Sequence, residues 1–321
     1  CILFERNWAN MSKHVKNRKI RSLIADLSLL LVALMWGGGF VAVKDALDSI
    51  TPYYMMTIRF ICAGLLLGLM FFKQTIKTTK KDIVNGVIIG IFLFGGFAVQ
   101  TIGLQYTTAG KQAFLTAVYV VIIPFFAWFV DKTKPDFYTI VSTVLALIGI
   151  GLLTITKGFE FNINIGDTLT LMGSVLFAAH IVAVGHFAKK SDPIILSVIQ
   201  MIFAGILSFI CALIFEPTFT GVSKGAFSAI FYLVFFSTML AFFIQNIAQR
   251  YTHPNHVGII LCLESVFGAI LAVIFLNDVF TVNMIIGCAI IFIAIITSET
   301  KLSFLKNKSN ENENSKDVSI D

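Results

Sequence analysis

The chain has 321 residues, of which 57% are hydrophobic and only 13% are charged, and its mean hydropathy is +0.87. A soluble domain carries roughly 25% charged residues, so this composition excludes an ordinary soluble protein and indicates a membrane protein. The net charge of +6 does not indicate nucleic-acid binding, because most of the positive residues lie in short connections between apolar segments.

Solid apolar runs of about 20 residues recur along the chain, and each is long enough to cross a bilayer as a helix. A transmembrane β-barrel would instead show short segments of alternating hydrophobicity. The sequence therefore predicts an all-α polytopic membrane protein with ten transmembrane helices. They are expected at 26–44, 52–72, 83–105, 110–130, 136–156, 167–187, 193–215, 227–249, 256–276 and 280–298.

Both termini are predicted to be cytoplasmic. Ten spans place them on one side, and 19 of the 24 Lys and Arg residues then fall on that side, as is typical of the cytoplasmic face. Residues 1–25 are expected to form a cytoplasmic segment, with Met11 as the natural start. Residues 299–321 are expected to be a disordered cytoplasmic tail, because they are polar and rich in Asn and Ser. The expected location is the plasma membrane.

The two halves of the chain resemble each other. A shift of 141 residues matches Asp26 with Asp167, Pro52 with Pro193, and 63–64 with 204–205. Farther along, a shift of 145 places 105–127 over 250–272. Each half then holds five spans, so the second enters the membrane from the opposite face. The sequence thus predicts inverted five-helix repeats at 26–156 and 167–298, with a substrate site between them.

Four segments carry a resemblance to a known family. They are MWGGGFVAVK at 35–44, TPYYMMTIRFICAG at 51–64, GLQYTTAGKQAFLTAVYVVIIPFFAW at 103–128 and QRYTHPNHVGIILCLESVFGAILAVIFLND at 249–278. The chain resembles an EamA-type member of the drug/metabolite transporter superfamily. This resemblance implies ten helices, cytoplasmic termini, and export or exchange of small metabolites, without fixing the substrate. The sequence departs from the family at Ser265, where a proline commonly follows the glutamate.

Three consecutive glycines, Gly37, Gly38 and Gly39, follow Trp36 in the first span. Small residues let helices approach closely in a bilayer, and a glycine run can also let a helix bend. A packing seam and a gating hinge both fit the run. Two alanines and His180 occupy the equivalent second-half positions, so we expect spans one and six to line a central cavity.

Glu264 is the strongest site candidate, because it is the only acidic residue far from any span end. An ionisable residue at mid-span costs about 2.5–3.5 kcal/mol on insertion scales and usually serves function. We expect it to bind a substrate amine or to carry a coupled proton; a structural ion pair or hydrogen bond is the alternative. Its counterpart in the first repeat is Tyr119.

Arg59, in the outer half of span two, is a candidate for binding a substrate carboxylate, with snorkelling or bonding to loop carbonyls as the alternative. Lys111 begins span four at the outer face, where an interfacial anchor is the more ordinary interpretation. Further candidates for the cavity lining are Trp36, Gln100, Tyr119, His180 and Gln245. The alternatives are a lipid-facing position for the two aromatic residues, a contact between helices for the two glutamines, and a structural hydrogen bond for the histidine.

The sequence gives no indication of an enzyme, a cofactor or a metal site. It has no phosphate-cradling glycine loop, no nucleophile elbow and no metal spacing of cysteines, and HPNH at 253–256 has no third ligand nearby. We expect a secondary transporter that works by alternating access and exports amino acids or related amphipathic solutes. The alternatives are export of lipophilic cations, a lipid enzyme and a scaffold. The expected partners are the small-molecule substrate, the lipid bilayer, a coupling proton and a second copy in a homodimer, with no nucleic acid.

Overall fold

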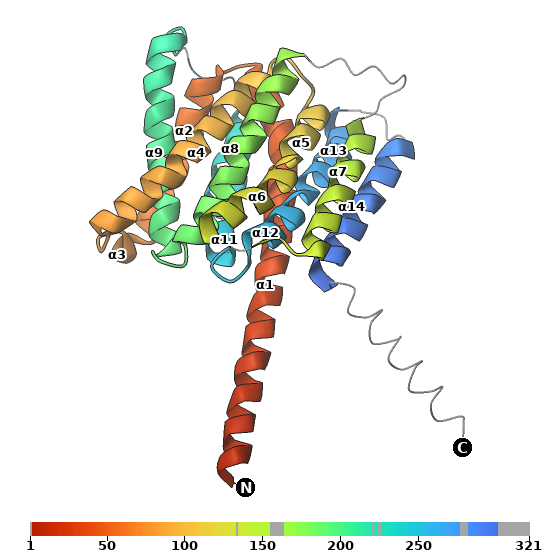
Figure 1. The fold of residues 1–321 in the computed structure, drawn as a ribbon. Helices are drawn as coiled ribbons and strands as arrows, with labels where there is room; N and C mark the ends of the chain where they lie inside the picture. Colours follow the sequence, from red (N-terminus) through yellow and green to blue (C-terminus); the bar gives the residue numbers. More distant parts are fainter. Residues whose placement is uncertain are drawn as a thin grey trace.

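The structure is a computed structural model, and it describes residues 2–132, 134–154, 164–219, 221, 223, 226–276 and 282–300. Within these residues every regular element is a helix, and the helices pack side by side in one bundle (Figure 1). In chain order they are α1 (Ile2–Leu47), α2 (Pro52–Met70), α3 (Phe72–Thr75), α4 (Lys80–Leu104), α5 (Ala109–Ala117), α6 (Tyr119–Asp131), α7 (Phe137–Thr154), α8 (Ile165–Phe187), α9 (Pro193–Phe215), α10 (Ala226–Val234), the π-helix η1 (Phe235–Leu240), α11 (Ala241–Ala248), α12 (Pro254–Leu261), α13 (Leu263–Leu276) and α14 (Val282–Thr300).

Eight stretches of the described residues are long and apolar enough to cross a membrane. Helices α7 and α14 contain shorter apolar stretches, Phe137–Gly149 and Ile285–Ala294, so the ten expected spans correspond to eight full candidates and two shorter ones. Helix α1 begins at Ile2 and runs without a break through the segment expected to precede the first span. The predicted tail lies mostly outside the described residues, beyond position 300.

Helix starts follow from local sequence chemistry. Proline is favoured at the first helical position, where its missing N–H has no partner to lose. Three helices begin in this way, at Pro52, Pro193 and Pro254. Two others begin with a capping box, in which side chain and backbone bond reciprocally: Thr79 with Asp82 in α4, and Asn164 with Asp167 in α8.

Three spans that we expected to be continuous are interrupted. The stretch 110–130 divides into α5 and α6 at Val118, and 256–276 divides into α12 and α13 at Cys262. The stretch 227–249 contains the π-helical turn η1 between α10 and α11. The first two breaks are related by the shift of 145, which places Val118 one residue from Cys262. The repeats therefore share a bend as well as a sequence pattern.

Helices α2 and α9 pack against each other through reciprocal contacts. A Cβ placed on Gly64 would lie 2.7 Å from Ile202, and one placed on Gly205 would lie 2.7 Å from Ile61. Gly64 and Gly205 match at a shift of 141, and so do Ile61 and Ile202. The same glycine–isoleucine contact is thus made twice, once in each direction.

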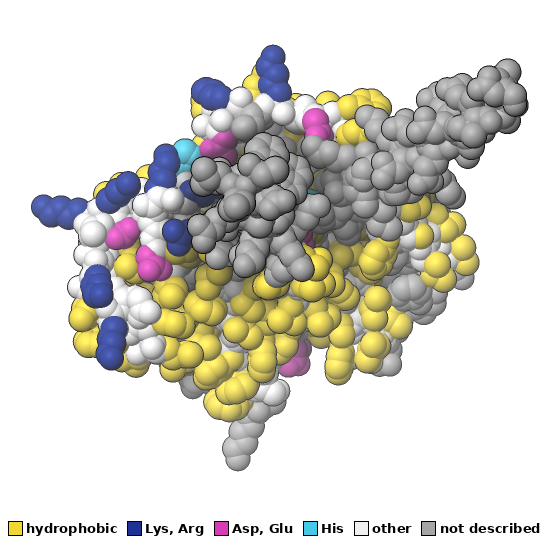
Figure 2. All heavy atoms as spheres, turned by 90° about the horizontal axis from the view of Figure 1, so that it is seen from below, with side chains coloured by type: hydrophobic (Ala, Val, Ile, Leu, Met, Phe, Trp, Pro, Cys, Tyr) yellow, Lys and Arg dark blue, Asp and Glu magenta, His cyan; other side chains and the backbone are white. Residues whose placement is uncertain are grey.

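One end of the bundle is rich in positive charge. Figure 2 views this end, beyond which the N-terminal turns of α1 project, and Lys and Arg side chains gather along its left and upper edges. The connections after α2, α6, α8 and α11 reach it. Their exposed cations are Lys73, Lys77, Lys80, Lys81, Lys132, Lys134, Lys189, Lys190 and Arg250.

Candidate functional site

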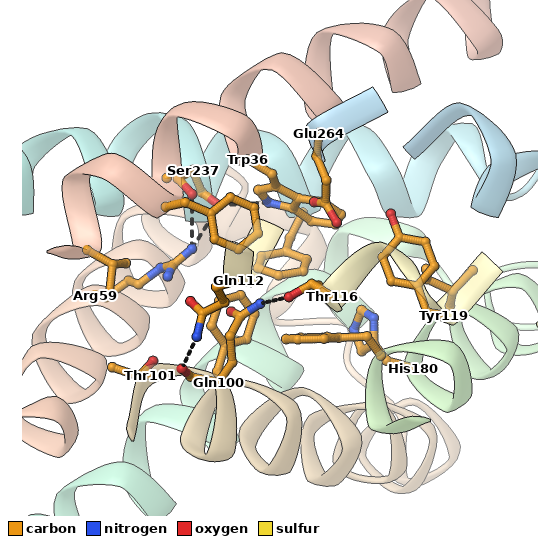
Figure 3. A pocket seen from close by; sticks show the side chains of 17 residues that line it. Trp36, Arg59, Gln100, Thr101, Gln112, Thr116, Tyr119, His180, Ser237 and Glu264 are labelled. Atoms are coloured by element: carbon orange, nitrogen blue, oxygen red, sulfur yellow. Dashed lines mark hydrogen bonds between the residues drawn. The ribbon is translucent and has the colours of Figure 1, made fainter. Parts of the chain in front are cut away.

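A pocket lies between the helices of the bundle (Figure 3). Most of its walls are aliphatic or aromatic, with a small number of polar groups, which is the usual composition of a small-molecule site. Its lining residues are Trp36, Gly39, Phe40, Val43, Arg59, Phe97, Gln100, Thr101, Gln112, Thr116, Tyr119, Phe177, His180, Ile181, Ser237, Phe242 and Glu264.

The structure brings seven of the predicted site residues together around this pocket. They are Trp36, Gly39, Arg59, Gln100, Tyr119, His180 and Glu264. Four others lie elsewhere: Gly37, Gly38, Lys111 and Gln245.

The π-helical turn η1 positions Arg59. Its Nη2 atom donates to the carbonyl oxygen of Ser237 at 3.3 Å and to the Ser237 hydroxyl at 3.0 Å, and its Nε atom donates to the Thr238 hydroxyl. The guanidinium also lies 4.5 Å from the centre of the Phe97 ring. Arg59 is 2% exposed, and no carboxylate of the described residues pairs with it. A guanidinium held in this way can bind an anionic group that enters the pocket.

The same turn holds Trp36 in the pocket wall. Because a π-helical turn departs from regular α-helical bonding, the Ser237 carbonyl can accept the Trp36 indole N–H at 3.0 Å as well as the arginine. The Trp36 ring packs 5.3 Å from the Phe242 ring, centre to centre.

The two helix breaks position Tyr119 and Glu264. Each residue lies in the first turn after its break, Tyr119 in α6 and Glu264 in α13. Figure 3 shows the Tyr119 hydroxyl and the Glu264 carboxyl pointing toward one another. Both side chains are almost fully buried, and within the described residues neither the hydroxyl nor Oε1 of Glu264 has a hydrogen-bond partner. Buried polar groups without partners are costly, so this pair favours a role in binding.

His180 has a partner within the protein. Its Nε2 atom lies 2.8 Å from Oε1 of Gln200. Because an amide oxygen only accepts, Nε2 carries the proton in this bond. The ring also packs 5.8 Å from the Phe242 ring, so His180 forms a fixed part of the wall.

A layer of amides and hydroxyls lines the end of the pocket near the α4–α5 connection. Gln100 donates to the Thr116 hydroxyl at 2.9 Å, and Gln112 donates to the backbone carbonyl of Gln100 at 2.7 Å. Of the residues in this layer, the sequence predicted only Gln100 as part of the site. Thr116 has no distinguishing sequence signal, because its role depends on how α4 packs against α5.

Two residues of the glycine run face helices, and only the third faces the pocket. A Cβ on Gly37 would lie 2.8 Å from the backbone nitrogen of Gly268 in α13. Gly38 lies beneath the Tyr232 hydroxyl, and a Cβ on Gly39 would lie 2.7 Å from the Ser237 hydroxyl. Helix α1 stays continuous through all three. The run therefore forms a packing seam on several sides of α1.

Lys111 forms an ion pair outside the pocket. Its Nζ atom lies 2.6 Å from Oδ2 of Asp167, and Thr107 donates to Oδ1 of the same carboxylate at 2.8 Å. This bridge joins the start of α5 to the start of α8, as an anchor would. Gln245 is also outside the pocket, fully buried in α11.

The HPNH segment organises the start of α12. His253 caps the helix by accepting from the Asn255 N–H at 3.4 Å, and His256 lies 3.3 Å from Asp26. Burial, with a smaller contribution from Lys189, lowers the pKa of His253. Within the described residues no group of three or more potential ligands could hold a metal.

Long apolar helices packed around a central pocket are the architecture of a multi-pass membrane protein. The EamA-like transporter family matches the chain twice, over residues 23–155 and 164–299. The chain belongs to this family, as its sequence resemblance had indicated. It is therefore a transporter rather than an enzyme, with the bilayer as its environment and a small molecule as its substrate.

Individual relatives agree with this assignment. An uncharacterized transporter of Archaeoglobus fulgidus is 36% identical over 277 residues, covering 86% of each chain. The uncharacterized transporter YetK of Bacillus subtilis is 24% identical and covers 86% of this chain and 87% of its own. A crystal structure superposes with a TM-score of 0.73 over 88% of this chain and 98% of the other; at 19% identity, this similarity concerns the fold alone.

Proposed function

We propose that this protein is a secondary transporter that moves amino acids or closely related zwitterionic metabolites across the plasma membrane by alternating access, with export as its physiological direction. The pocket of Figure 3 is the substrate site in this proposal. A proton is the proposed coupling ion, and a homodimer is the proposed assembly.

One observation carries the choice of substrate. The pocket is lined both by a guanidinium without a carboxylate partner, that of Arg59, and by a carboxyl group with an unpartnered oxygen, that of Glu264, among the described residues. A zwitterion offers a carboxylate to the first and an ammonium to the second. The aromatic walls would then hold its apolar side chain.

The proposed topology has ten spans in two inverted repeats, 26–156 and 167–298, with both termini in the cytoplasm. It is supported by the two family matches along the chain and by the reciprocal contacts of α2 and α9. The cluster of exposed cations on the end shown in Figure 2 supports the orientation. Helices α7 and α14 are the fifth and tenth spans of this arrangement.

Counterflow in proteoliposomes tests the substrate class. Vesicles containing the full chain are loaded with a pooled panel of amino acids and metabolites, and uptake of labelled pool members is measured. We expect an amino acid to exchange, and we expect its amine and acid analogues, each lacking one charged group, to compete poorly. Exchange of either analogue as effective as that of the parent would contradict recognition of a zwitterion.

Export of lipophilic cations is the second candidate. The rings of Trp36, Phe97, Phe177 and Phe242 would favour a cation above their faces, and Glu264 would add a negative group. Arg59 opposes it, because a second positive charge would enter the same pocket. Exchange of a permanently charged lipophilic cation that outcompetes every amino acid in the panel would favour this candidate.

A further inference from the structure

The pocket is built partly from equivalent positions of the two repeats. Aligning the halves at shifts of 141 and 145 pairs several of its lining residues with each other. Three such pairs are Trp36 with Phe177, Phe97 with Phe242, and Tyr119 with Glu264. These residues lie near the middle of their candidate membrane spans, so the centre of the pocket is shared equally by the two repeats.

Other lining residues have equivalents that do not line the pocket. Arg59, Gln100 and Thr101 extend the pocket toward the end of the bundle where α4 meets α5. Their equivalents in the second repeat are Gln200, Gln245 and Asn246, which lie toward the opposite, positively charged end. All three equivalents are fully buried, and none of them lines the pocket. The pocket thus reaches into only one half of the bundle.

The buried equivalents have polar groups without partners in the described residues. Neither amide atom of Gln245 forms a hydrogen bond, and Nε2 of Gln200 and Oδ1 of Asn246 are also unpartnered. Leaving a buried polar group unpaired costs about 1–3 kcal/mol. Three amides of this kind, at neighbouring positions of α9 and α11, are unusual in a folded protein.

The repeat comparison explains why Gln245 has no partner. In the first repeat, Gln100 donates to the Thr116 hydroxyl. The position equivalent to Thr116 in the second repeat is Leu261, which is fully buried and apolar. Gln245 therefore keeps the amide group of Gln100, but the hydrogen bond that Gln100 makes to Thr116 cannot form with Leu261.

We propose that Gln200, Gln245 and Asn246 form a second half of the substrate path, which opens toward the cytoplasm when the two repeats exchange conformations. In that state their amide N–H groups donate to the carboxylate of the substrate, and their amide oxygens accept from its ammonium. The inference rests on the proposed alternating access, in which each repeat takes in turn the conformation of the other.

Cysteine labelling tests this path without a known substrate. The test uses Gln245→Cys, its equivalent Gln100→Cys and the control Ile291→Cys, in a full chain whose native cysteines are replaced by serine or alanine. Ile291 is also fully buried, but it lies in α14, where it packs against Gly149 of α7 and not against the pocket. A membrane-impermeant, charged methanethiosulfonate is then added to right-side-out and to inside-out vesicles.

We expect Gln100→Cys to react from the external side, Gln245→Cys to react from the cytoplasmic side, and Ile291→Cys to react from neither. If the inward-open state is a minor one, populated at roughly 0.1–10%, labelling of Gln245→Cys is slower than that of Gln100→Cys by about 10- to 1000-fold but still proceeds to completion. Asn246→Cys lies at the same depth and should also be labelled from the cytoplasmic side.

Labelling of Gln245→Cys and Asn246→Cys only after denaturation would overturn the proposal, and so would labelling of Gln100→Cys and Gln245→Cys from the same side. The result separates this inference from the proposed substrate. Sided labelling without amino-acid exchange would leave the path standing and remove the zwitterion. Amino-acid exchange without labelling at positions 245 and 246 would support the zwitterionic substrate and rule out the second half of the path.

Discussion

At the scale of single residues, Glu264 gives the sharpest test of the site. Glu264→Gln keeps the size and hydrogen-bonding capacity of the side chain but removes its charge and its titration. If the carboxylate binds a substrate ammonium, losing a charge-assisted hydrogen bond worth about 1.5–3 kcal/mol raises the KM for exchange by about ten- to a hundredfold. If it carries a proton, uptake driven by a pH gradient fails while exchange survives. Unchanged kinetics in both assays would make Glu264 a structural residue.

Arg59 can be tested by separating its charge from its geometry. Arg59→Lys keeps the positive charge but loses the planar fork that reaches both the Ser237 carbonyl and the Thr238 hydroxyl. We expect exchange of the zwitterion to weaken by about tenfold in Arg59→Lys and to disappear in Arg59→Gln, measured at equal amounts of protein in the membrane. Equal exchange by the two variants would show that no anionic group of the substrate depends on the charge.

The sequence predicts some of the candidate site residues and not others for a physical reason. Arg59 and Glu264 are ionisable side chains within apolar runs, so their insertion cost is visible without a structure. Thr116 and Ser237 are ordinary polar residues in helices, and only the packing of the helices shows that they face the pocket. Gln245 lies outside the pocket, because equivalent positions of two repeats need not have the same surroundings in one conformation.

At the scale of helices, ends were easier to predict than interruptions. Prolines and capping residues mark where α2, α4, α8 and α9 begin. Val118 and Cys262 are not strong helix breakers, so nothing local indicates a break at either position. The breaks matter for the site, since Tyr119 and Glu264 follow them.

The glycine run predicts a graded response to substitution. Gly37 faces the backbone of α13, which cannot move aside, whereas Gly38 faces the far end of the Tyr232 side chain, which can move at the expense of its hydrogen bond to the Met35 carbonyl. We expect Gly37→Ala to lower stability by about 1–3 kcal/mol through overpacking, and Gly38→Ala to lower it much less. Thermal unfolding of the two variants in detergent measures the difference. A larger loss in Gly38→Ala would mean that the α1–α13 contact is not the tight one.

In the close contact between α2 and α9, unlike in the glycine run of α1, the two glycines occupy equivalent positions of the two repeats. Substituting either one is therefore expected to have the same effect. Gly64 and Gly205 each face an isoleucine of the other helix, and a Cβ placed on either glycine would lie 2.7 Å from that isoleucine. Leucine at either position should therefore disturb the same interface to a similar extent. The similar effect is expected because α2 and α9 occupy matching places in the two repeats.

At the scale of the whole molecule, the inversion of the repeats can be tested at equivalent connections. Thr78 lies between the second and third helices of the first repeat, and Pro217 lies in the corresponding connection of the second repeat. Inverted repeats require these connections to lie on opposite sides of the membrane. The lysines near Thr78 predict that it is cytoplasmic, so Pro217 should be external.

Reporter fusions at these two positions give the measurement. A reporter that is active only in the cytoplasm should be active after Thr78 and silent after Pro217, and a reporter active only outside should give the reverse. A third fusion after Ser191, which follows α8 beside Lys189 and Lys190, should match Thr78 and controls for expression of the longer fusion. Activity of the same reporter after Thr78 and Pro217 would contradict the inversion, because the two repeats would then cross the membrane in the same sense.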